Sequence, residues 1–171
     1  MRLRSAFAFA FALVLAAPAA AQDYPKLKPG LWEMTSTTST QKKGDPPLRT
    51  TMCLDEASAR ELYRFSQGMM EGMCSKFDVK RSGNRWSSEA VCKLGDSRMV
   101  ARSTMTLSGD TAYTIEGSSS YDPPFMGVKD ATTSVQARHA GPCKPGQKPG
   151  DVTTPGGQTV NILAPRPPSG K

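Results

Sequence analysis

The sequence predicts a mainly β protein: an antiparallel meander that forms a curved sheet or a partly closed barrel, with one packed α-helix and two disulfides. Three observations lead to this prediction. Strand-like runs separated by short turn signals fill most of the chain, one stretch has helical periodicity, and four cysteines follow an N-terminal export signal.

The N-terminus has the composition of a secretory signal peptide. Arg2 and Arg4 form a basic start, residues 6–17 are an apolar run too short to span a membrane, and residues 18–21 offer a small-residue cleavage site. We therefore expect residues 1–21 to be removed and the cysteines to form disulfides in an oxidising compartment. We expect residues 22–164 to fold as one domain, residues 165–171 to be disordered, and the mature chain to have no transmembrane segment.

The first predicted elements are a hairpin and the one helix. Residues 31–40 and 48–53 are strand material on either side of a turn at 44–47. Residues 55–72 are predicted to be helical, with Asp55 as the N-cap. One apolar stripe follows this helix, formed by Leu62, Phe65, Met69 and Met73. We expect the stripe to pack on the sheet as ordinary core, and a Met-rich binding groove is the alternative interpretation.

The second half of the chain has hairpin patterns. The predicted strands cover residues 74–82, 85–93, 97–107, 111–121 and 131–139. Two-residue turn signals, Gly83-Asn84 and Gly109-Asp110, join the first two pairs of these strands. A loop is predicted over 122–130. The Pro- and Gly-rich segment after Cys143 is expected to be mostly irregular, with a short edge strand at 158–163.

Four cysteines, Cys53, Cys74, Cys92 and Cys143, allow three disulfide pairings. They lack zinc-site spacing, so we expect no metal site. The turn at 83–84 places Cys74 opposite Lys93, one step from Cys92, and a β-bulge would correct this offset. We therefore predict a Cys74–Cys92 disulfide, which leaves Cys53–Cys143 as the second.

The sequence has no recognisable catalytic motif. It contains no nucleophile elbow, no phosphate-binding glycine loop and no His-Glu-x-x-His. His139 is the single histidine and lies at the end of a predicted strand, which favours a structural role over a cryptic hydrolase. The formal net charge is +7, but the basic residues are scattered. We therefore expect no enzymatic activity, no cofactor and no nucleic-acid partner.

The predicted 122–130 loop is the most suggestive contact surface. Phe125 and Met126 follow two prolines there, on a stiffened connection where exposed apolar side chains would mark a binding site. The alternative is that Phe125 plugs one end of the sheet. Together with Trp32 and Trp86, these two residues are the predicted ligand- or partner-binding residues.

Two short motifs support a family resemblance. Pro29-Gly30-Leu31-Trp32-Glu33 follows the export signal, and residues 138–143, Arg-His-Ala-Gly-Pro-Cys, precede Lys-Pro-Gly-Asp at 148–151. With the four cysteines, these motifs resemble a bacterial exported family known as a domain of unknown function (DUF3617), over nearly all of the mature chain. The resemblance implies a periplasmic protein of Gram-negative bacteria with no established activity, and it transfers no catalytic residue.

These inferences together predict a non-catalytic periplasmic module that binds a small apolar ligand or an envelope component. The reason is the missing chemistry combined with a β architecture that can hold a cavity. The alternative is a protein-interaction or inhibitor module that uses the 122–130 loop, with the disulfides providing rigidity.

Overall fold

The computed structural model describes residues 24–164. The predicted signal peptide at 1–21 and the predicted disordered tail at 165–171 lie outside the described residues. Nine strands and one helix follow one another in the described part of the chain. They are β1 (Gly30–Thr38), β2 (Leu48–Leu54), α1 (Glu56–Met73), β3 (Cys74–Ser82), β4 (Arg85–Leu94), β5 (Ser97–Ser108), β6 (Ala112–Phe125), β7 (Val128–Gly141), β8 (Asp151–Thr153) and β9 (Thr159–Asn161).

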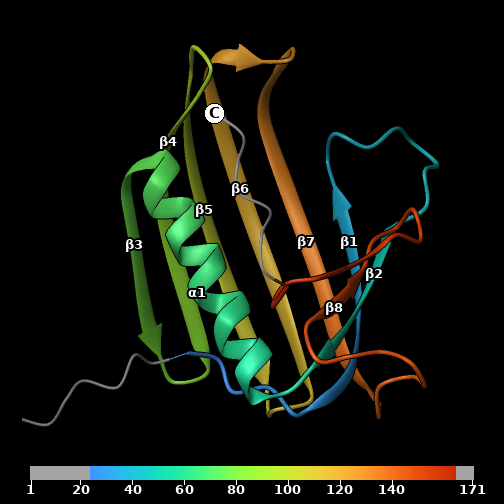
Figure 1. Ribbon diagram of the computed structural model, residues 1–171. Coiled ribbons are helices and arrows are strands. Elements are labelled where there is room, and N and C mark those ends of the chain that lie inside the picture. Colours follow the sequence, from blue (N-terminus) through green and yellow to red (C-terminus); the bar gives the residue numbers. More distant parts are fainter. Residues whose placement is uncertain (1–23, 165–171) are drawn as a thin grey trace, which may run out of the picture.

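The strands form a single antiparallel sheet in the order β3-β4-β5-β6-β7-β1-β2-β8-β9 (Figure 1). Strands β3 to β7 are a meander, as predicted. The chain returns so that β1 pairs with β7 rather than with β3, and the sheet does not close on itself. The predicted curved antiparallel sheet with one helix is therefore confirmed.

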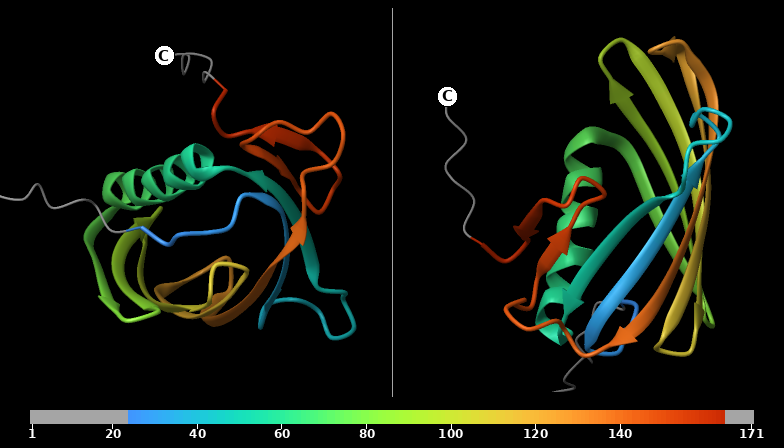
Figure 2. Two further views of the ribbon diagram at one scale, coloured as in Figure 1. Left: turned by 90° about the horizontal axis from the view of Figure 1, so that it is seen from below. Right: turned by 90° about the vertical axis from the view of Figure 1, so that its right-hand side faces the viewer.

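Helix α1 lies across the mouth of the curved sheet. Seen along the strands, the sheet forms an open arc, and α1 covers the gap between β2 and β3 (Figure 2). The chain enters the helix directly from β2 and leaves it directly into β3. We call the end where α1 begins the lower end of the sheet and the end that carries the β4–β5 and β6–β7 turns the upper end, as in Figure 1.

The core fills the lower half of the concave face. Its buried members come from β1, β2 and β4 to β7: Trp32, Met52, Leu54, Trp86, Leu107, Tyr113 and Ala137. Leu62 of α1 and Leu27 of the segment before β1 pack against this cluster. That segment, residues 24–29, crosses the lower end of the arc (Figure 2). The backbone N–H of Lys28 donates to the carbonyl oxygen of Asp110 in the β5–β6 turn, 2.8 Å away, so the lower end is covered.

The predicted disulfide pairing is confirmed. Cys74 bonds to Cys92, and Cys53 bonds to Cys143. The register of β3 and β4 pairs Ser82 with Arg85 and is shifted by one residue just after Cys74, which is the bulge that the sequence predicts. The second disulfide ties the end of β2 to the residue that follows β7 by two positions.

The predicted 122–130 loop is wrong, because strands occupy most of it. Strand β6 continues to Phe125 and β7 begins at Val128, so only Met126 and Gly127 form the turn. Both have positive φ, 49° and 82°, as a tight type I′ hairpin requires. The prolines are tolerated because the β6–β7 register is interrupted between Ser120 and Phe125, where no β7 acceptor needs an N–H.

Candidate ligand-binding surface

Side chains on the concave face become less buried from the lower to the upper end. Tyr113 of β6 faces Leu107 of β5, and both are buried. Two residues further up each strand, Ile115 and Met105 are only half-buried. The strands therefore extend beyond the packed core, and β5 to β7 reach past the C-terminal end of α1 (Figure 2).

Small side chains line this upper part of the concave face. Along each strand they alternate with outward-facing residues, so they lie on the same face as the core. We call these residues the upper concave surface. They are Ser36, Thr38, Ser88, Ala101, Ser103, Gly117, Ser119, Ala131 and Thr133. Their hydroxyls are partly paired with each other: the Oγ atoms of Ser88 and Ser103 are 2.8 Å apart, and Ser119 donates to the Tyr121 hydroxyl at 3.1 Å.

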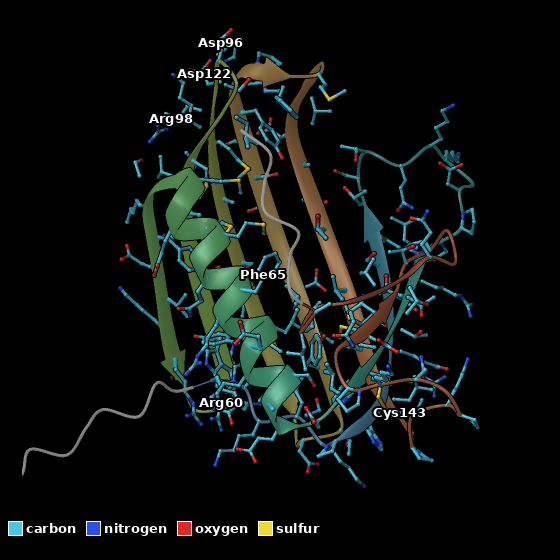
Figure 3. The ribbon with its side chains drawn as sticks, viewed as in Figure 1. Arg60, Phe65, Asp96, Arg98, Asp122 and Cys143 are labelled. Atoms are coloured by element: carbon cyan, nitrogen blue, oxygen red, sulfur yellow. A yellow bond between two sulfur atoms is a disulfide. The ribbon has the colours of Figure 1, made fainter. Side chains whose placement is uncertain are left out.

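The apolar stripe of α1 is incompletely covered. Leu62 packs on the core, whereas Met69 and Met73, seven and eleven residues later on the same helix face, are 45% and 46% exposed. Phe65 is 38% exposed and lies on the flank of the helix nearer β6 (Figure 3). The expectation that the whole stripe is ordinary core is therefore wrong beyond Leu62, since Phe65, Met69 and Met73 remain exposed.

The start of α1 is held rigidly, which sets the position of this stripe. Asp55 and Ser58 form a reciprocal capping box: the backbone N–H of Ser58 donates to Oδ1 of Asp55 at 2.7 Å, and the backbone N–H of Asp55 donates to Oγ of Ser58 at 2.8 Å. The Ser58 N–H holds the pKa of the Asp55 carboxyl below its usual value. Arg60 also contacts Tyr24, both through a hydrogen bond and over its ring.

A groove of about 300 Å³ opens on the other flank of α1, between the helix and β3. Its lining residues are Tyr63, Gln67, Glu71, Phe77, Val79, Arg81 and Trp86. The Arg81 guanidinium lies over the Trp86 ring, 4.7 Å from its centroid. Trp86, one of the predicted binding residues, therefore lines a groove although only 7% of its surface is exposed.

The other predicted binding residues lie far apart in the fold. Trp32 is completely buried in the lower core. Phe125 and Met126 lie at the β6–β7 turn of the upper end, 37% and 88% exposed, and Phe125 stacks on Tyr121 with 6.0 Å between ring centroids. The structure thus does not bring the four residues into one site. Sequence reasoning also missed the upper concave surface, for which the signal was the run of small residues at alternate strand positions.

The two motifs that carried the family resemblance meet at the lower end. Nε2 of His139 donates to the Pro29 carbonyl oxygen, 2.9 Å away, and the His139 ring lies edge-on to Trp32. Gly30 faces Gly141 so closely that a Cβ at Gly30 would lie 2.3 Å from the Gly141 oxygen. These contacts favour the structural interpretation of His139.

Ionisable groups in the described residues do not form a metal centre. Between residues 24 and 164, no group of three or more His, Cys, Asp or Glu side chains has a suitable arrangement. Burial raises the pKa of Tyr113 to about 12, and its hydroxyl donates to Sδ of Met34 at 3.4 Å. Tyr113 therefore stays neutral and belongs to the core. None of the helices in this range is long and apolar enough to cross a membrane.

Comparison with known proteins gives one match. A family model described as "Protein of unknown function (DUF3617)" matches residues 27–143. The resemblance inferred from the motifs is therefore confirmed. No curated protein and no solved structure gave a significant match.

Proposed function

This chain belongs to the DUF3617 family of proteins of unknown function, and from its geometry we propose that it is an exported binding protein for an amphiphile with a long acyl chain. The acyl chain lies between the apolar stripe of α1 and the upper concave surface. The observation that carries this proposal is the exposure of Met69 and Met73 on the same helix face as the packed Leu62.

The dimensions of this surface suit an extended chain. Leu62 and Met73 are eleven residues apart, which corresponds to about 16 Å along the axis of an α-helix. The lower end is covered by residues 24–29, whereas the upper end carries the β1–β2, β4–β5 and β6–β7 turns. A linear ligand would therefore place its apolar end against the core and its polar end upward.

The chemistry of the two walls suits an amphiphile better than a pure hydrocarbon. Methionine side chains are flexible and adapt to apolar chains of different shape. The opposite wall carries serine and threonine hydroxyls, which would hydrogen-bond a headgroup or ester. Each buried methylene contributes about 0.8 kcal/mol, so six of them would contribute roughly 5 kcal/mol.

An oxidising compartment agrees with this proposal. All four cysteines are in disulfides, and such bonds persist in secreted and periplasmic proteins. The N-terminal segment has signal-peptide composition. We place the protein in the periplasm on these grounds.

The proposal is tested by titrating the delipidated protein with a fluorescent fatty acid, cis-parinaric acid. Ser119 points into the concave face and its neighbour Ser118 points outward, so Ser119→Trp and Ser118→Trp are matched variants of one residue type. We expect saturable binding to the native protein, at least tenfold weaker binding to Ser119→Trp, and unchanged binding to Ser118→Trp. Met69→Asp, which places a charge on the helix wall, should also weaken binding.

Circular dichroism and thermal melting of each variant establish that its fold is retained. Absence of saturable binding to the native protein would refute the proposal. Equal effects of Ser119→Trp and Ser118→Trp would refute the location, because only the former fills the concave face.

A second candidate function rests on the β6–β7 turn. Met126 is 88% exposed next to a Phe125 ring that is fixed by stacking on Tyr121. An exposed, rigid apolar pair of this kind is typical of a protein-contact site. Crosslinking in the periplasm through a photoreactive residue at position 126 would capture such a partner. The Met126→Asp substitution should then abolish binding of the captured partner.

A further inference from the structure

The outer face of the sheet carries a groove on the side opposite the core. Its volume is about 510 Å³ and its lining comes from β1, β2, β5, β6 and β7. The lining residues with outward-facing side chains are Glu33, Thr35, Arg49, Thr51, Ser108, Ala112, Thr114, Gln136 and Arg138. Their positions alternate with those of Trp32, Met52, Tyr113 and Ala137 in the core, which places them on the convex side.

The register arranges these side chains in two rows that cross the strands. One row runs Thr51, Glu33, Arg138, Ala112, Ser108, and the other runs Arg49, Thr35, Gln136, Thr114. The residues between the rows, such as Met34 and Ala137, point into the core and contribute backbone to the floor. The groove is therefore formed by outward-facing side chains of several strands and is not a gap left by poor packing.

The charged side chains of the groove differ in whether they form an ion pair. Arg138 forms an ion pair with Glu33 on the neighbouring strand. Arg49 is exposed and has no ion-pair partner among residues 24–164. The groove thus contains two guanidinium groups and one carboxylate, which leaves one positive charge uncompensated.

We propose that this outer groove binds a saccharide that carries one acidic group, a carboxylate or a phosphate. The Arg49 guanidinium would pair with the acidic group, since its planar donors match carboxylate and phosphate oxygens. Threonine hydroxyls and the Gln136 amide would bind the sugar hydroxyls. From the register, the Cα atoms of Arg49 and Arg138 lie two strands and two residues apart, about 12 Å, a separation that suits a disaccharide.

This site is independent of the acyl-chain site because the two lie on opposite faces of the sheet. An acidic sugar suits the outer groove rather than the concave face, where the upper concave surface has no charged member. The variant Ser119→Trp should therefore leave saccharide binding unchanged, and failure of one proposal would not decide the other.

The test is an NMR titration of the ¹⁵N-labelled protein with cellobiose, cellobiouronic acid and cellobiose phosphate. We expect the two acidic sugars to shift the amides of Thr35, Thr114 and Gln136, and cellobiose to bind at least tenfold more weakly. A preference between the two acidic sugars would identify the physiological group as carboxylate or phosphate.

The variant pair Arg49→Gln and Arg85→Gln controls for general charge. Both arginines are exposed and lie on the outer face, in the same row across the sheet. Neither has an ion-pair partner among the described residues, but only Arg49 lines the groove. We expect Arg49→Gln to weaken binding of the acidic sugars roughly tenfold, as for the loss of one charged hydrogen bond, and Arg85→Gln to leave it unchanged. Equal losses in both variants, equal binding of cellobiose, or no shifts in the groove would overturn the proposal.

Discussion

The indole N–H of Trp32 donates a hydrogen bond to the carbonyl oxygen of Lys28, 2.9 Å away. Trp32 is the most buried large side chain of the core, and Lys28 belongs to the segment that crosses the lower end of the sheet. The bond therefore joins the centre of the core to the chain that covers it, and it orients the segment through which Leu27 reaches the core.

Replacing Trp32 by Phe should lower the free energy of unfolding by about 3 kcal/mol, from lost packing and an unpaired Lys28 carbonyl. Chemical denaturation followed by circular dichroism measures this change. Trp86→Phe is the control, because the Trp86 indole has no hydrogen-bond partner in the described residues and would lose packing and part of its contact with Arg81 but no hydrogen bond. Equal losses for the two variants would show that the hydrogen bond contributes nothing.

Gly30→Ala should be among the most destabilising single substitutions, at about 3 kcal/mol or more. Gly30 has φ of 136°, and a Cβ there would lie 2.3 Å from the Gly141 oxygen and 2.5 Å from Nε2 of His139. Gly44→Ala is a matched control, since Gly44 also has positive φ but nothing within 4 Å of its Cβ position. The control should cost only about 1 kcal/mol, from backbone strain. Similar thermal unfolding of the two variants would contradict the close approach at Gly30.

Asp55→Asn should remove part of the pH dependence of the free energy of unfolding. The capping hydrogen bond lowers the folded-state pKa of Asp55, so its contribution is full above the unfolded-state pKa and is lost as the pH falls through the folded-state value. Asparagine retains a capping oxygen but does not titrate. We expect native protein to be more stable than Asp55→Asn at about pH 6 and to lose this advantage at about pH 3. A difference in urea midpoints that does not change with pH would rule out this contribution.

Two substitutions on one helix face should have unequal effects on stability. Leu62→Ala should cost about 2–3 kcal/mol, because Leu62 packs on the buried core. Met69→Ala should cost less than about 1 kcal/mol, because nearly half of its side chain is already exposed. Urea unfolding of both variants without added ligand gives this comparison. A large loss for Met69→Ala would mean that the upper part of α1 packs on the sheet after all.

Local patterns were sufficient for most of the fold. The Gly83-Asn84 turn set the β3–β4 register, and that register correctly identified both disulfides. Asp55 was identified as the N-cap because a carboxylate at this position satisfies free backbone N–H groups of the first turn. The same local reasoning failed at residues 122–130, where proline suggested a loop but an interrupted register accommodated it within β6.

The candidate sites depended on tertiary structure. The periodicity of Leu62, Phe65, Met69 and Met73 identified an apolar helix face, but periodicity does not tell how far the opposite surface lies. Likewise, Arg49 and Arg138 are 89 residues apart in sequence, and only the pairing of β1 with both β2 and β7 brings them to one groove.

By itself, the sequence determined the antiparallel strands, the helix with its cap and the disulfide pairing, because turns, caps and bulges depend on neighbouring residues. The tertiary structure decided that the sheet stays open, that the upper part of the α1 stripe remains exposed and that the outer groove forms on the opposite face. These features depend on the summed curvature of nine strands, to which every pair of neighbouring strands contributes and which no single segment specifies.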